Sequence, residues 1–178
     1  MAGIVRTEYF VLDTGPLLDF FVWQCDKQYY STWLKNAIQI VALKDEILKD
    51  GFRAFLDRHK GRLITSPGVI AELQGHVLRA GGNTMELQRR FWMLVQTQMC
   101  QLEFLENTHR IVDMTTDMLI KLGPVDTSII EIAKANMSSY KRFIVLTSDS
   151  GVFKRCTEEE APVQWITDTI EQFIEESL

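Results

Sequence analysis

Residues 9–21 read YFVLDTGPLLDFF and contain the pattern that decides the expected fold. Four residues that favour strands, Tyr9 to Leu12, stop at an acid, and Thr-Gly-Pro then leads into a second apolar run. A short apolar run that ends at turn-forming residues is typical of a buried strand. Because proline is favoured at the beginning of helices, the segment predicts a strand, a loop and the start of a helix.

Short segments of similar character follow along the chain. We expect further strands at residues 62–65, 110–113, 143–147 and 163–166. Between them, apolar residues recur at helical spacing, which predicts helices at about 30–49, 52–59, 84–106, 115–122 and 127–136, one that begins at Ser66-Pro67, and short helices after residues 149 and 168. Strands that alternate with helices are typical of a parallel sheet covered on both faces.

We therefore expect an α/β fold with a central parallel sheet of about five strands. No linker composition interrupts the sequence, so one domain over residues 1–178 is expected, with an enlarged helical region at about 23–62. Asp50-Gly51 is expected to end the helix at 30–49, because this pair favours turns. Asp126, Asp149 and Asp168 each stand where a capping residue is expected at the start of a helix.

Composition narrows the class of protein. Of 178 residues, 46% are hydrophobic and 24% are charged, which is typical of a soluble globular protein with a substantial core. A net charge of -5 is unfavourable for a protein that only coats nucleic acid, because such proteins are usually basic. It counts less against a nuclease, whose acids can hold metal ions. The three cysteines are far apart and are expected to be free thiols. We expect a complete, cytoplasmic chain, because no apolar run approaches the length of a membrane span.

Four acids are expected to gather at one edge of the sheet. Asp13 and Asp149 directly follow strands, Glu72 lies in the second turn of a helix that follows another strand, and Asp126 opens a helix. In an open parallel sheet, sites form outside the carboxyl ends of the strands. Mg²⁺ and Mn²⁺ prefer oxygen ligands, and such ions promote phosphodiester hydrolysis. Taken alone, Asp126 and Asp149 are explained as helix caps and Glu72 as an exposed helix residue, whereas Asp13 ends an apolar strand and is harder to explain in this way. The prediction therefore depends on the set of four acids.

Four segments resemble, in order, the motifs of the PIN-domain family of nucleases. They are VLDTGPLL, SPGVIAEL, LGPVDTSIIEIAK and IVLTSDSGVF, and together they extend over most of the chain. The resemblance implies a PIN-like fold and a Mg²⁺- or Mn²⁺-dependent endoribonuclease in which metal-bound water attacks RNA. It assigns metal binding and catalysis to Asp13, Glu72, Asp126 and Asp149, and a supporting role to Thr14 and Thr147.

The best-known small members of that family are VapC-like toxins. This implies a small antitoxin protein and a homodimer as partners, although residues 23–62 form a longer segment than a compact toxin has. Two alternatives stay open: a PIN-fold RNA-binding or scaffold module without activity, and a structure-specific DNA nuclease. Lys154 and Arg155 lie close to Asp149, where they either contact substrate phosphates or keep the surface soluble. The scattered histidines, His76 among them, lack metal-ligand spacing and are treated as ordinary residues.

Overall fold

The computed structural model describes residues 6–29, 46–79, 85–106, 116–135 and 140–178. Its strands are β1 Thr7–Leu12, β2 Leu63–Thr65, β3 Leu105–Glu106, β4 Lys141–Thr147 and β5 Val163–Trp165. They pair in parallel in the order β3-β2-β1-β4-β5. The expected α/β fold with a central parallel sheet is confirmed. The expected count of about five strands is reduced to four strands of three residues or more, because β3 is only two residues long.

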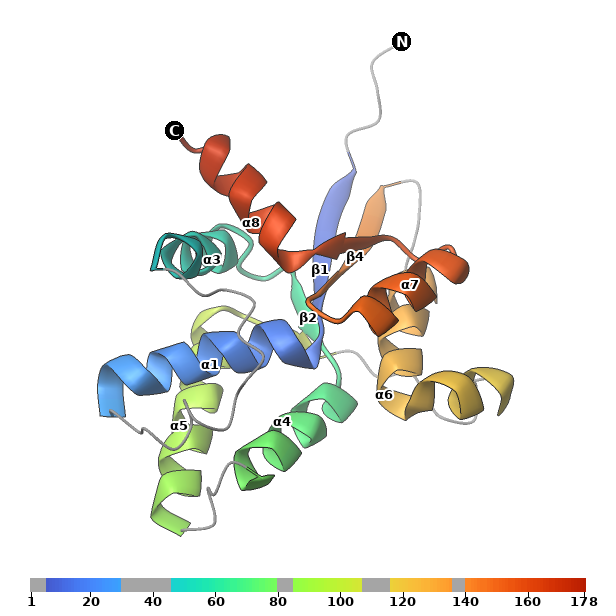
Figure 1. Cartoon of the computed structure of the whole chain (residues 1–178). Coiled ribbons are helices and arrows are strands. Elements are labelled where there is room, and N and C mark those ends of the chain that lie inside the picture. The colour runs from blue at the N-terminus through green and yellow to red at the C-terminus, as the bar shows by residue number, and fades with distance from the viewer. Residues whose placement is uncertain (1–5, 30–45, 80–84, 107–115, 136–139) are drawn as a thin grey trace.

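Helices cover both faces of this sheet. The described ones are α1 Thr14–Tyr29, α3 Glu46–Arg58, α4 Pro67–Arg79, α5 Met85–Gln101, α6 Thr116–Ala135, α7 Ser150–Glu158 and α8 Ile166–Glu175. Figure 1 shows α1 and α3 on one side of β1 and β4, and α6 and α7 on the other. The central strands are therefore buried on both faces, as their continuous apolar sequences predict. Every helix in the described ranges is too short or too polar to cross a lipid bilayer.

The order of strands reverses between β1 and β4. From β1 the chain proceeds outward to β2 and β3, whereas β4 leads to β5 on the other side. The two central strands pair along six residues, from Thr7 opposite Lys141 to Leu12 opposite Leu146. In open α/β sheets a crevice forms at the carboxyl ends of strands where the order reverses. The fold therefore places such a crevice directly beyond Leu12 and Leu146.

The expected loop after the first strand is absent. Helix α1 begins at Thr14, immediately after Asp13, whose main-chain oxygen accepts a hydrogen bond from Leu17 N at 3.4 Å. Pro16 is compatible with this arrangement because the N–H groups of the first helical turn have no partner inside the helix. The prediction of a loop was wrong, and the consequence is that Asp13 is held between a strand and a helix.

The expected helix break at Asp50-Gly51 is also absent. Residues 30–45 lie outside the described ranges, but α3 continues through Gly51. A Cβ atom at Gly51 would lie 2.5 Å from Ile174 Cδ1 and 3.0 Å from Ile170 Cγ2 of α8. The glycine thus allows α3 and α8 to approach closely, and this tertiary contact outweighs its low helix propensity.

Two further boundaries differ from the prediction. The helix expected at 84–106 ends at Gln101, because Glu103 adopts a left-handed conformation with φ of 52° and the chain then turns into β3. The last helix begins at Ile166, with Trp165 in the capping position, so Asp168 lies in its first turn and does not cap it. The strand expected at 110–113 lies outside the described ranges.

Substitution of Gly51 by alanine tests the contact between α3 and α8. Overpacking costs about 1–3 kcal/mol, and alanine returns about 1 kcal/mol of helix propensity. We expect Gly51→Ala to lower the free energy of unfolding by about 1 kcal/mol, measured by urea denaturation. The double variant Gly51→Ala, Ile174→Val removes the nearest methyl group and should show less than the summed loss of the single variants. Additive losses would contradict the contact.

Candidate functional site

A cavity of about 490 Å³ lies at the reversal point of the sheet. Acids from four separate parts of the chain line it: Asp13 after β1, Glu72 in α4, Asp126 in α6 and Asp149 before α7. The remaining lining residues are small, hydroxylated or apolar, with one histidine: Thr14, Gly15, Leu18, His76, Ser148, Ser150 and Val152. The four acids that the sequence singles out therefore face one common space.

Asp13 is the most deeply placed of these acids, with 5% of its surface exposed. Its Oδ1 accepts a hydrogen bond from Thr14 N at 2.6 Å, and its Oδ2 accepts one from Thr147 Oγ1 at 2.6 Å. Burial raises the pKa of Asp13, and the charges of Glu72 and Asp149 raise it further, while the two hydrogen bonds oppose the shift. Both carboxylate oxygens are thus held in place at the floor of the cavity.

Two threonines connect Asp13 to its neighbours. Thr14 Oγ1 donates a hydrogen bond to Glu72 Oε2 at 2.6 Å, which links α1 to α4. Thr147 Oγ1 donates to Asp13 and also accepts a hydrogen bond from Asp149 N at 2.9 Å. Three acids are therefore positioned through hydroxyl groups on β4 and α1.

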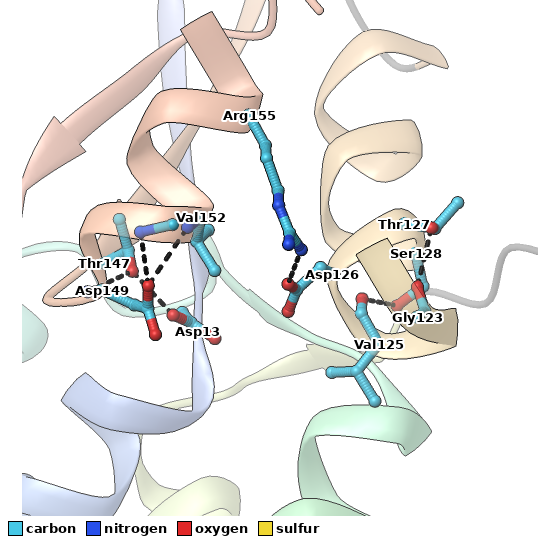
Figure 2. Close-up of polar contacts among 11 residues, drawn as sticks. Asp13, Gly123, Val125, Asp126, Thr127, Ser128, Thr147, Asp149, Val152 and Arg155 are labelled. Carbon is cyan, nitrogen blue, oxygen red and sulfur yellow. Dashed lines mark hydrogen bonds and ion pairs between the residues drawn. The ribbon is translucent and has the colours of Figure 1, made fainter. Parts of the chain in front are cut away.

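Asp149 also caps helix α7. Its Oδ1 accepts hydrogen bonds from Gly151 N at 2.6 Å and Val152 N at 3.2 Å (Figure 2). These bonds satisfy two of the main-chain donors that a helix start leaves without partners. The predicted cap is confirmed, and the same side chain lines the cavity.

Asp126 was predicted to cap its helix, but it lies inside helix α6 instead. Helix α6 is interrupted at Gly123, where φ is 78° and ψ is 167°, and Pro124 begins its second part. Proline is favoured at the first helical position, so the helix restarts earlier than Asp126 and leaves this acid in the first turn. Thr127 Oγ1 donates a hydrogen bond to Gly123 O at 2.7 Å across the interruption (Figure 2).

Arg155 pairs with Asp126 at the side of the cavity. Its Nη1 lies 2.9 Å from Asp126 Oδ2, and both side chains are partly buried (Figure 2). Burial and the neighbouring charge of Asp13 raise the pKa of Asp126 to about 6, although Arg155 opposes the shift. The charges of Glu72 and Asp149 also raise the pKa of Asp126.

The two predicted substrate-binding cations are separated by the structure. Lys154 projects from α7 with 78% of its side chain exposed and lies 3.7 Å from Glu158, away from the residues that line the cavity. Arg155 points toward Asp126 instead. His76, which the sequence analysis treats as an ordinary residue, lines the cavity one helical turn after Glu72. A spacing of four residues places Glu72 and His76 on one face of a helix, and this spacing is the feature of the sequence that indicates His76.

The thiol of Cys156, in α7, is buried and disfavoured as a nucleophile. Cys156 is fully buried, and burial together with the charges of Asp13 and Asp126 raises its pKa to about 12. A thiol with such a pKa stays protonated at neutral pH and reacts poorly. The carboxylates, His76 and the hydroxyl groups of Ser148 and Ser150 are the groups of the cavity lining that remain available for chemistry.

The donor set suits a hard divalent cation. Carboxylate oxygens are the ligands that Mg²⁺ and Mn²⁺ prefer, and a cation would relieve the mutual repulsion that raises the pKa values of Asp13 and Asp126. Within the described ranges, no three histidine, cysteine, aspartate or glutamate side chains converge around one point as they stand. Binding of an ion therefore requires side-chain rotation, most directly of Asp126, which is turned toward Arg155.

Comparison with protein-family models and with curated protein sequences finds no match to this chain. The residues around the cavity are therefore the basis on which its function is inferred.

The raised pKa of Asp126 predicts how stability depends on pH. An acid whose pKa is raised from 3.8 to about 6 on folding costs little well below pH 3.8, where the acid is protonated in both states, and costs most above pH 6. In EDTA, Asp126→Asn should therefore raise the melting temperature at pH 7.5 by about 2–4 °C, or ~1 kcal/mol, with the gain fading below pH 4.

Arg155→Gln is the matched variant for this prediction. It removes the charge that opposes the shift, so it should lower the melting temperature at pH 7.5 in the same buffer. A gain for Asp126→Asn that persists at pH 3.5 would show that its cause is not the ionisation of Asp126.

Proposed function

We propose that this protein is a metal-dependent endoribonuclease of the PIN type. The observation that carries the proposal is that four acids from four separate parts of the chain line one cavity at the reversal point of a parallel sheet. Carboxylates crowded in this way repel one another and destabilise the fold, so they are expected at functional sites. A scaffold module would have no use for such a costly arrangement.

Asp13, Glu72, Asp126 and Asp149 would hold Mg²⁺ or Mn²⁺. A bound ion of this kind neutralises charge on a phosphate and activates water for attack on phosphorus. Thr147 and Thr14 keep the carboxylates of Asp13 and Glu72 in fixed orientations through hydrogen bonds of 2.6 Å.

Arg155 supports a phosphodiester substrate, because guanidinium groups bind phosphate well, and RNA follows from the resemblance to PIN ribonucleases. Its contact with Asp126 puts a positive charge beside an otherwise acidic cavity. An antitoxin that occludes the site is part of the proposal, and it would offer a cation to the same acids. A homodimer is the expected assembly, but residues 30–45, part of the apolar helix on which that expectation rests, lie outside the described ranges.

Removal of one proposed metal ligand, Asp13, tests the proposed nuclease activity. Purified protein should cut labelled total RNA into discrete fragments with Mg²⁺ or Mn²⁺ and not with EDTA. Asp13→Asn should reduce the rate at least about 100-fold, which corresponds to ~2.7 kcal/mol of transition-state stabilisation. Asp57→Asn, an exposed acid on α3, is the matched control and should cut normally.

The outcomes separate the alternatives. If Asp13→Asn cuts RNA as fast as the unchanged protein, the assignment of the site is refuted. If the protein cuts branched or single-stranded DNA in preference to RNA, DNA is the substrate. Folded protein that cuts no nucleic acid and binds no Mn²⁺ in calorimetry would favour a binding module.

Thr147 provides a second test through metal affinity. Removing a group that orients a metal ligand typically costs 10–100-fold in affinity or activity. Thr147→Val keeps the shape of the side chain but removes the donor to Asp13 Oδ2, so Mn²⁺ affinity in calorimetry should fall by about this factor. Thr147→Ser retains the hydroxyl and should restore most of it. Equal affinity in Thr147→Val would contradict the positioning role.

A further inference from the structure

A second, smaller cavity lies on the other side of helix α7. It measures about 220 Å³ and lies where α7, β5 and α8 meet. Two aromatic rings line it, those of Phe153 and Trp165, which stack with centroids 4.4 Å apart and planes inclined by 4°. Both residues are only partly buried. A cavity below the about 300–1,000 Å³ typical of sites for drug-sized molecules suits a single flat group.

This aromatic cavity lies, like the four acids, at the carboxyl ends of the strands. Trp165 is the register partner of Thr147, the residue whose hydroxyl holds Asp13. Neighbouring strands are about 4.8 Å apart, so the backbones of these two residues are in adjacent positions. On α7, Val152 lines the acidic cavity and Phe153 lines the aromatic one. The two cavities are therefore separated by about the width of one helix, ~10 Å.

Polar groups surround the stacked rings. Gln164, Asp168, Thr169 and Gln172 also line the aromatic cavity, and together they present amide, carboxyl and hydroxyl groups. Thr169 Oγ1 donates a hydrogen bond to Trp165 O at 2.8 Å, which ties α8 to the end of β5. A flat apolar surface with donors and acceptors at its rim matches an unstacked nucleobase, which offers a π face and a polar edge.

We propose that the aromatic cavity binds a base of single-stranded RNA next to the bond that is cut. The inference rests on the proposed function, because it assigns the substrate of the same site as a single strand whose bases are exposed. A base that stacks on the pair formed by Trp165 and Phe153 would fix the register of the strand, and the acids beyond α7 would then face its backbone. Stacking on aromatic side chains is tolerant of sequence, so the polar rim would set any preference.

Binding measured without catalysis tests this site. In EDTA, an adenosine hexaribonucleotide and a hexamer of the same backbone without bases are titrated against the full chain by fluorescence anisotropy. Stacking of one base contributes about 1–3 kcal/mol, so Trp165→Leu should weaken binding of the adenosine hexamer by about tenfold. Trp165→Phe, which keeps an aromatic face, should bind nearly as well as the natural chain. Neither variant should change the affinity for the hexamer without bases.

Two further variants control for folding. Phe153→Leu removes the other ring and should weaken binding of the adenosine hexamer while the melting curve remains cooperative. Tyr140→Leu changes an exposed aromatic residue just before β4, at the opposite edge of the sheet, and should leave affinity unchanged. Equal affinity of the natural chain for both hexamers would overturn the proposal, and so would equal losses for both hexamers in Trp165→Leu.

The result is distinguishable from failure of the proposed function. Base-dependent binding through Trp165 in a protein that cuts no RNA would refute the nuclease and leave the base site. Metal-dependent cleavage with the same rate and sequence preference in Trp165→Leu would refute the base site and leave the nuclease.

Discussion

The burial of the Asp13 carboxylate is the constraint around which the rest of the site is arranged. A carboxylate with 5% exposure is unfavourable unless hydrogen bonds compensate for the water it loses. One bond comes from the first residue of α1 and the other from the last residue of β4. Since β1 and β4 are the neighbouring central strands, the acid can be satisfied only when the sheet is correctly paired. The same two threonines then reach Glu72 and Asp149, so one buried charge orders two others.

The crowding of acids is balanced in two different ways. The carboxylate of Asp149 is stabilised by hydrogen bonds from two main-chain N–H groups at the start of α7. Asp126 is compensated less completely, since Arg155 lowers its pKa but the net shift remains upward, to about 6. The cavity therefore retains uncompensated negative potential, which is the condition under which a divalent cation stabilises a folded protein most.

Sequence patterns predicted the elements that depend on local chemistry. The apolar run before Asp13, the run at 143–147 and the Ser66-Pro67 helix start all appear in the structure, the last with a hydrogen bond from Val69 N to Ser66 Oγ. The errors arose where tertiary contacts decide. Gly51 stays helical because α8 packs against it. His76 lines the cavity because α4 packs against α1 and α6, which bring residues distant in the sequence together. Asp126 is a different case, because a local signal decides it: Pro124 begins this part of the helix, so Asp126 lies inside its first turn.

The pairing of the first strand with the fourth has a consequence for biosynthesis. The bond between Asp13 and Thr147 joins residues 134 positions apart, and such long-range contacts form late in folding. A growing chain on the ribosome folds from its amino terminus, yet β1 has no β4 beside it until residues 141–147 have been made. The acidic cavity therefore cannot assemble before Thr147 and Asp149 have been made, and a chain that stopped before β4 would carry Asp13 without the hydroxyl that holds its Oδ2.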